Sequence, residues 1–155
     1  MTIQKLKMRP IQFGDHNKRQ ILTQFGALCY RVRRDKIQVL LVTSRTTKRW
    51  IVPKGWPMPG ATPHEAALTE AWEEAGVKGR AIGNSLGIFS YGKRYEGDVL
   101  PCVVAVFAVK VGTLAAGYPE VKERKRKWFS RKKAAALVME PELQHIIRSF
   151  DPQLA

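Results

Sequence analysis

The segment from Thr62 to Gly76 constrains the fold of this chain more than any other, because it carries the signals of both ends of a helix. Thr62 is a suitable N-cap, Pro63 suits the first helical position, and Glu65 completes a capping box with the threonine. Gly76 is a natural terminator, since glycine adopts the left-handed backbone that ends many helices. The sequence therefore predicts one well-delimited helix between Thr62 and Gly76.

Three carboxylates gather on one face of this predicted helix. With successive residues about 100° apart, Glu70, Glu73 and Glu74 fall within one arc of about 100°. The apolar residues on the opposite side are Leu68, Ala71, Trp72 and Ala75. We expect this apolar side to pack on a sheet and the carboxylates to point the other way. Clustered carboxylate oxygens suit Mg²⁺ or Mn²⁺, so the helix is a candidate metal site; the alternative is an ordinary solvated acidic face.

Strand-like apolar runs lie on both sides of the helix in the sequence. They cover residues 24–31, 37–43 and 50–52 before it, and residues 81–91, 100–111 and 125–129 after it. Ser130 is expected to cap a helix over residues 131–138, and Pro141 to open a last helix. This order, β-β-β-α-β-β-β-α-α, predicts an α+β fold in which helices cover a mixed sheet as an α/β/α sandwich.

Residues 1–20 are polar and basic and have no clear period, so we expect a basic N-terminal arm ahead of a single domain over residues 21–150. The sequence shows neither a signal peptide nor an apolar run of the ~18 residues that cross a bilayer. Cys29 and Cys102 lie in apolar runs and are expected to be buried thiols in a reducing compartment, not zinc ligands. We therefore expect a soluble cytoplasmic protein with no membrane partner, and leave its oligomeric state open.

The charge balance narrows the choice of partner. The chain has 27 Lys and Arg against 13 Asp and Glu, a net charge of +14. Such an excess favours an anionic partner: a nucleic acid, an anionic membrane or a polyphosphorylated ligand. Residues 122–133 hold eight basic residues in twelve, a density that is common in nucleic-acid-binding patches.

The stretch from Gly55 to Val77 resembles the signature of the Nudix hydrolases. The positions that match it in type and spacing are Gly55, Glu70, Ala71, Glu73, Glu74, Gly76 and Val77. Two positions depart from it, since Ala61 stands where the signature has its first glutamate and Thr69 where it has an arginine. In the family those two side chains pair and help to orient the metal-binding glutamates. The resemblance covers about residues 20–150 and implies a Nudix-type sandwich.

The resemblance also implies a metal-dependent mechanism. Glu70 and Glu74 would bind Mg²⁺ or Mn²⁺ directly, and Glu73 directly or through water. The carbonyl of Gly55 would add one more oxygen, and the cation would neutralise phosphate charge and acidify an attacking water. The general base is open: besides the helix glutamates, the candidate carboxylates are Glu96 and Asp98 in one loop and Glu120 and Glu123 in a later one. The catalytic residues that we expect are Glu70, Glu73 and Glu96.

Other segments are similar to the diphosphoinositol polyphosphate phosphohydrolases and to relatives that cleave diadenosine polyphosphates. These segments are residues 43–45, 49–53, 73–79, 86–89 and 124–129. In that family the residues matching Arg45 and Lys125 contact substrate phosphates. The other basic residues expected to bind phosphate are Arg49, Lys93, Arg94 and Arg126. Lys54 departs from a family glycine triplet, and a Pro-Lys-Gly sequence is more usual among dinucleoside polyphosphate hydrolases.

These observations predict a Mg²⁺-dependent hydrolase of phosphoanhydride bonds in a polyphosphorylated small molecule, either a dinucleoside polyphosphate or a diphosphoinositol polyphosphate. Two alternatives stay open. One is an RNA 5′-pyrophosphohydrolase, for which RNA would be a partner of the basic residues. The other is a non-catalytic RNA-binding or regulatory protein on a Nudix scaffold, since a fold does not fix a function.

Overall fold

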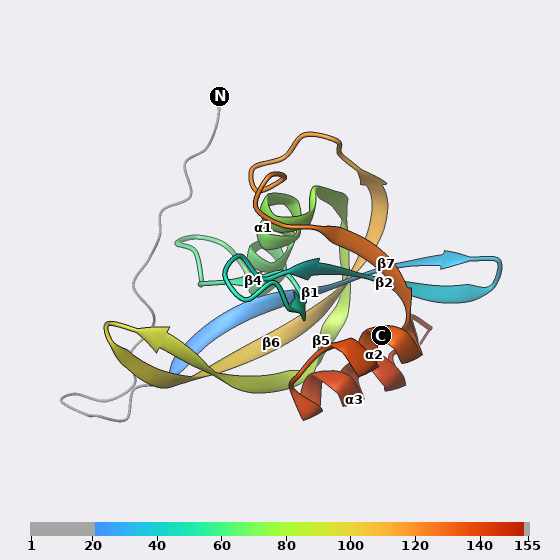
Figure 1. Ribbon diagram of the computed structural model, residues 1–155. Helices are drawn as coiled ribbons and strands as arrows, with labels where there is room; N and C mark the ends of the chain where they lie inside the picture. Colours follow the sequence, from blue (N-terminus) through green and yellow to red (C-terminus); the bar gives the residue numbers. More distant parts are fainter. Residues whose placement is uncertain (1–20, 154–155) are drawn as a thin grey trace.

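A mixed β-sheet with helices on both faces forms the part of the chain that the computed structural model describes, residues 21–153 (Figure 1). Its strands are β1 (Leu22–Arg33), β2 (Lys36–Thr43), β3 (Trp50–Ile51), β4 (Lys54–Gly55), β5 (Val77–Tyr95), β6 (Asp98–Leu114) and β7 (Arg126–Ser130). The helices are α1 (Pro63–Ala75), α2 (Arg131–Leu137) and α3 (Pro141–Ser149). None of these helices is long and apolar enough to cross a membrane. The predicted N-terminal arm, residues 1–20, lies outside the described residues.

The sheet has the strand order β3-β2-β1-β6-β5, with β4 paired to β1 and β7 paired to β2. β1 and β6 run parallel, and the other pairs run antiparallel. Arg34 and Asp35 adopt positive φ angles of 52° and 63° and make the tight turn of the hairpin between β1 and β2. The mixed sheet predicted from the element order is therefore present.

The strands differ from the prediction at two places. The predicted strands do not include residues 54–55, yet Lys54 and Gly55 pair with Gly26 and Phe25 of β1. The backbone N–H of Ala27 also donates to Pro53 O at 2.9 Å, which anchors this segment to the sheet. In addition, β5 and β6 form a longer hairpin than predicted, because register shifts next to glycines absorb the irregular stretches.

The α/β/α sandwich is confirmed by two separate apolar clusters, one on each face of the sheet. On one face, α1 contributes Ala67, Ala71 and Ala75. On the other face, α2 and α3 contribute a second set, namely Ala134, Ala135, Leu143, Ile146 and Ile147. Figure 1 shows α1 on one side of the sheet and α2 with α3 on the other. Cys29 and Cys102 are free and buried, as expected, and burial raises the pKa of both thiols.

The helix signals predicted for α1 are confirmed. Thr62 Oγ1 accepts from the N–H of Glu65 at 3.1 Å, and Glu65 Oε1 accepts from the N–H of Thr62 at 2.9 Å. Gly76 has a φ of 66° and closes the helix. A Cβ at Gly76 would also collide with the rings and guanidinium of Tyr118 and Arg126, so only glycine suits this position.

The expected orientation of α1 is confirmed for Ala71, Ala75 and Leu68, which pack on the sheet side, and is wrong for Trp72 and for two of the glutamates. The prediction placed Leu68, Ala71, Trp72 and Ala75 against the sheet and the three carboxylates away from it. In the structure Leu68 and Trp72 are only half-buried, whereas Glu70 and Glu74 are 2% and 4% exposed. The physical reason is size: the helix lies close to the sheet on its alanines, and the neighbouring carboxylates turn inward to face β4 and the loop before β7.

Candidate active site

A cavity of about 350 Å³ lies between α1, β4, β5 and two loops, the β2–β3 loop (residues 44–49) and the β6–β7 loop (residues 115–125). The residues that line it are Glu70, Glu73, Glu74, Lys54, Gly55, Tyr91, Lys93, Gln24, Ser44, Arg45, Thr46, Ile51, Trp56, Glu120 and Arg124. Carboxylates and basic side chains thus share one cavity. The helix supplies most of the carboxylates, and the strands and loops supply the cations.

Gly55 allows the backbone of β4 to approach the carboxylate of Glu70. A Cβ built on Gly55 would fall on the carboxyl group of Glu70, with all three carboxyl atoms as its nearest neighbours. The register of β4 against β1 fixes this approach, because Gly55 pairs with Phe25. The carbonyl of Gly55 and the carboxylate of Glu70 consequently lie in the same small region.

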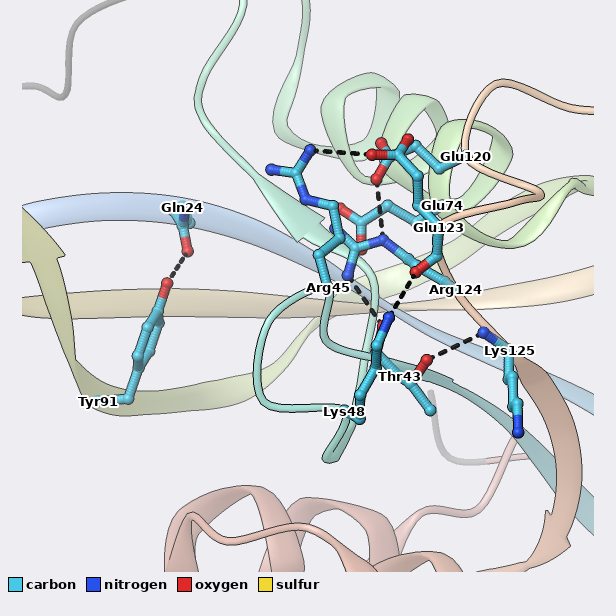
Figure 2. A network of polar contacts seen from close by, with 10 residues as sticks. All are labelled: Gln24, Thr43, Arg45, Lys48, Glu74, Tyr91, Glu120, Glu123, Arg124 and Lys125. Carbon is cyan, nitrogen blue, oxygen red and sulfur yellow. Dashed lines mark hydrogen bonds and ion pairs between the residues drawn. The ribbon is translucent and has the colours of Figure 1, made fainter.

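Glu74 is buried and faces a cation. Its Oε1 lies 3.7 Å from a guanidinium nitrogen of Arg124, and within residues 21–153 no hydrogen-bond donor reaches that oxygen (Figure 2). Burial raises the pKa of the Glu74 carboxyl well above its usual value; Arg124 and Lys54 oppose the rise, and Glu70 adds to it. A buried carboxylate oxygen without a donor is costly unless a cation reaches it.

Arg124 ties the β6–β7 loop to α1 and β2, and it also pairs with Glu120 in the same loop. Its Nε donates to Glu120 Oε1 at 2.9 Å, and one of its terminal nitrogens donates to Thr43 O at 3.1 Å. Its side chain is only 9% exposed. The loop is also held to α1 by the N–H of Glu120, which donates to Glu73 O at 2.9 Å. Arg124 therefore links α1, β2 and the loop around the cavity.

A second group of polar side chains lines the opposite part of the cavity. Tyr91 Oη donates to Gln24 Oε1 at 2.6 Å, and the ammonium of Lys54 lies 5.0 Å from the Tyr91 ring centroid. Burial lowers the pKa of Lys54, whereas Glu74 opposes this effect. Lys93 places its ammonium 5.5 Å from the Trp56 ring centroid. Aromatic rings thus support both lysines that face the cavity.

The structure brings together seven of the residues singled out in the sequence: Gly55, Glu70, Glu73, Glu74, Arg45, Lys93 and Glu120. Other expected phosphate-binding residues lie elsewhere. Arg49 pairs with Glu140 at 3.0 Å, and Arg94 is exposed on β5. Arg126 donates to Ala75 O at 2.7 Å and lies over the Tyr118 ring, so it closes the end of α1.

The candidate bases are also separated. Glu96 occupies the exposed turn between β5 and β6 with a φ of 49°, and neither it nor Asp98 lines the cavity. Glu120 lines the cavity but accepts from Arg124, and Glu123 pairs with Arg45 on the surface at 3.5 Å. Lys125 lines an adjoining cavity.

Lys54, Tyr91 and Arg124 are among the lining residues that the sequence did not indicate. Lys54 lies outside the predicted strands, and Tyr91 ends a predicted strand without any sign of a site. Arg124 lies within the basic run 122–133, but nothing in that run separates a buried arginine from its exposed neighbours.

The donor set fits a hard divalent cation. Two buried carboxylates face one cavity, the Gly55 backbone approaches one of them, and an oxygen of Glu74 lacks a donor. In the described residues 21–153, no group of three His, Cys, Asp or Glu side chains is already arranged to hold a metal. A cation at this place would thus draw on backbone oxygen and water besides the carboxylates.

The chain is similar to known hydrolases in sequence. The NUDIX domain profile matches residues 22–150. Diphosphoinositol polyphosphate phosphohydrolase 3-alpha of Mus musculus is 32% identical over 126 residues, covering 80% of this chain and 73% of its relative. Diphosphoinositol polyphosphate phosphohydrolase 2 of Homo sapiens is 31% identical over 126 residues, covering 80% and 66%.

Solved structures agree on the fold. A C. elegans Ap4A hydrolase binary complex superposes with a TM-score of 0.63 at 23% identity, covering 85% of this chain and 96% of that one. The E. coli dihydroneopterin triphosphate pyrophosphohydrolase gives 0.64 at 19% identity, with 86% and 96% covered. These identities support the fold alone, whereas the profile match over most of the chain supports the family. The chain therefore belongs to the Nudix family and is a hydrolase of phosphoanhydride bonds.

Proposed function

We propose that this Nudix hydrolase uses Mg²⁺ or Mn²⁺ to cleave a polyphosphorylated small molecule, of the dinucleoside polyphosphate or diphosphoinositol polyphosphate class. The observation that carries the proposal is the cavity in which glutamates of α1 meet Arg45, Lys54 and Lys93. Carboxylates suit a cation, and guanidinium and ammonium groups suit phosphate oxygens. The similar proteins described above are named for their action on diphosphoinositol polyphosphates and on Ap4A, which supports this choice.

The residues that would hold the cation are Glu70, Glu73, Glu74 and the carbonyl of Gly55. A divalent cation supplies neutralisation of phosphate charge and a more acidic bound water when it is present. The chain's own part is to hold the reacting groups in place, since phosphoryl transfer depends mainly on positioning and charge stabilisation. The desolvated setting of Glu70 and Glu74 strengthens these charge interactions.

The other side chains act on the substrate. Arg45 and Lys93 bind phosphate oxygens beyond the reacting bond, and Lys54 reaches the phosphate nearest the glutamates. We propose Glu73 as the base that receives the proton of the attacking water, because it is the least buried of the three cavity-lining glutamates of α1. Glu96 lies in the β5–β6 turn, outside the cavity lining, and we no longer propose it as a base.

A substrate panel tests the proposed function. With Mg²⁺, kcat/KM should rise from ADP-ribose through diadenosine tetraphosphate to diadenosine hexaphosphate or a diphosphoinositol polyphosphate, because more phosphates can contact the cations. Added salt should lower kcat/KM, since part of the attraction is long-range. A preference for ADP-ribose would contradict the substrate class. A preference for 5′-triphosphorylated RNA would favour the RNA pyrophosphohydrolase, and binding without metal-dependent turnover would favour the non-catalytic alternative.

The surface pair of Arg45 and Glu123 predicts two opposite effects on KM. Their side chains are 56% and 48% exposed and lie 3.5 Å apart, so a substrate phosphate can replace the carboxylate of Glu123. Arg45→Ala should raise KM for the longest substrates about tenfold or more, as loss of a charge-assisted hydrogen bond does. Glu123→Gln should lower KM up to about fivefold, because an exposed ion pair contributes only about 0–1 kcal/mol.

Steady-state kinetics of both variants measure these effects. Arg34→Ala is the matched control, since it removes an exposed arginine at the other end of β2 and should leave KM unchanged at fixed ionic strength. If Glu123→Gln raises KM, the carboxylate supports the substrate and does not compete with it.

Gly55→Ala should inactivate the enzyme while leaving it folded. The new methyl group would occupy the position of the Glu70 carboxylate and push it out of the cavity. We expect kcat to fall by about 10²-fold or more, the usual scale for a misplaced charge-stabilising group. Gly117→Ala is the control, because a Cβ there meets no atom within 4 Å. Equal activity of the two variants would show that Glu70 does not need this position.

A further inference from the structure

A second cavity of about 480 Å³ adjoins the active site. The residues that line it are Thr43, Lys48, Trp50, Val121, Lys122, Glu123, Arg124 and Lys125. Arg124 lines both cavities, so they share a wall. None of the three glutamates of α1 lines the second cavity, which separates it from the reacting centre.

Besides the buried Arg124, two exposed contacts lie between the loops that line the two cavities. They are the contact of Arg45 with Glu123 and that of Lys48 Nζ with Glu123 O, both at 3.5 Å (Figure 2). These contacts join the β2–β3 loop to the β6–β7 loop. In the β2–β3 loop, Arg45 and Thr46 face the active site, whereas Lys48 faces the second cavity. A polyanion that displaces Glu123 from Arg45 would thus pass from one cavity into the other.

Trp50 gives the second cavity an aromatic surface that the other tryptophans do not offer. Three of the four tryptophans lie under a cation: Trp56 under Lys93, Trp72 under Lys78 and Trp128 under Arg31. In the described part of the chain no cation lies over Trp50. Its ring instead meets Phe129 at a centroid distance of 5.0 Å and an interplanar angle of 77°. The ring is partly buried against the core and also lines the second cavity.

The charge around Trp50 is that of a phosphate subsite. Lys48, Lys122 and Lys125 line the cavity, and Glu123 is the one carboxylate among its lining residues. The backbone N–H of Lys125 donates to Thr43 Oγ1 at 2.9 Å, which fixes the start of that side chain. A planar ring beside fixed cations is the combination that binds a nucleotide, because bases stack on aromatic faces and phosphates pair with cations.

We propose that the second cavity binds the far nucleotide of the substrate, with its base on Trp50 and its phosphates on Lys48 and Lys125. This rests on the proposed function and narrows it to dinucleoside polyphosphates. The polyphosphate chain then crosses Arg45 and Arg124 to reach the glutamates. An inositol ring is saturated and would gain nothing from the Trp50 ring, so a diphosphoinositol substrate would use the lysines but not the tryptophan.

Trp50→Leu tests this subsite, because it keeps an apolar contact for Phe129 and removes the ring face. For diadenosine tetraphosphate, KM should rise about tenfold, the scale of one lost base stack, with kcat within about twofold. For a diphosphoinositol polyphosphate, KM should stay unchanged. Trp50→Phe should retain most of the affinity, and Trp72→Leu, which does not line the cavity, should change neither KM.

A binding measurement separates failure of the subsite from failure of the proposed function. Diadenosine tetraphosphate titrated in EDTA should quench the intrinsic fluorescence of wild type and Trp72→Leu but much less that of Trp50→Leu, whether or not the chain hydrolyses it. If Trp50→Leu does not fold, a competition experiment with wild type replaces it. Adenosine 5′-tetraphosphate should displace bound diadenosine tetraphosphate at about tenfold lower concentration than inorganic tetraphosphate does. Equal competition, or an equal KM change for both substrate classes, would overturn the proposal.

Discussion

Glu74→Gln should lower kcat by about 10²–10³-fold, the scale of losing one group that stabilises charge in the transition state. The substitution replaces a buried, negatively charged ligand of the proposed metal by a neutral amide, which binds the cation less strongly. Measured with Mg²⁺ held in excess, the loss should persist, since added cation cannot replace the missing ligand. Turnover near that of wild type would remove Glu74 from the metal site.

The same substitution should stabilise the fold in the absence of metal. Burial raises the pKa of Glu74, so the folded chain binds a proton more tightly than the unfolded chain does. Stability is then lost as pH rises from the unfolded pKa through the folded one. A neutral glutamine avoids this loss, and the Tm of Glu74→Gln should exceed that of wild type at pH 7 but not at pH 4.

Glu65 provides a control of opposite sign on the same helix. Its hydrogen bonds with Thr62 lower its pKa, so it contributes stability above the unfolded pKa that is lost as pH falls. Glu65→Ala should therefore lower the Tm at pH 7, with the deficit shrinking toward acid pH. If Glu74→Gln lowers the Tm at pH 7 in EDTA, the carboxylate already has a compensating partner in the metal-free chain.

Arg124→Met should destabilise the chain by about 3–5 kcal/mol and reduce activity, as loss of one partner of a buried ion pair does. It would leave Glu74 and Glu120 without their common cation and Thr43 O without its donor. The double variant Arg124→Met, Glu74→Gln should recover part of the free energy of unfolding, because one of the abandoned charges is also gone. Strict additivity of the two substitutions would show that the pair is not coupled.

Metal titration separates a positioning role of Arg124 from a purely structural one. Arg126→Met is the matched control, since Arg126 binds Ala75 O and the Tyr118 ring but no glutamate of the cavity. Both variants should lose stability, but only Arg124→Met should change the Mg²⁺ concentration at half-maximal activity. Arg124→Lys should restore part of that response, because it returns the charge.

The two positions at which this chain departs from the family signature bear on the role of Arg124. Position 69 holds threonine, whose hydroxyl donates to Glu65 O at 3.0 Å and so turns back to the helix. Ala61 offers no carboxylate to balance an arginine there. The cation beside the glutamates comes from Arg124 in the β6–β7 loop, far along the chain from position 69. We propose that Arg124 takes over the orienting role that the arginine at position 69 has in the family.

Local signals in the sequence sufficed wherever the chemistry is local. Thr62, Glu65 and Gly76 predict both ends of α1, because capping involves neighbours within one turn. The spacing of Glu70, Glu73 and Glu74 predicts which carboxylates share a helix face. The helix wheel correctly placed Ala71 and Ala75 on the buried side, but it missed the burial of Glu70 and Glu74. It weighs residues such as Trp72 by hydrophobicity, whereas close helix–sheet contact favours the smallest side chains.

Contacts between distant segments could not be predicted in this way. Arg124 meets Thr43 across 81 positions, and Tyr91 meets Gln24 across 67. No periodicity marks such partners, and β4 escaped notice because its two residues are recognisable only by their pairing with β1. The basic residues show the same limit, since sequence cannot separate the buried Arg124 from the exposed Arg45.

The alanines under α1 have a consequence for how this protein tolerates change. Ala67, Ala71 and Ala75 are fully buried and set the height of the helix above the sheet. An added methylene at any of them would lift the whole row of glutamates that shares the helix. Substitutions in this buried row are therefore expected to move the glutamates as well as to disturb the packing.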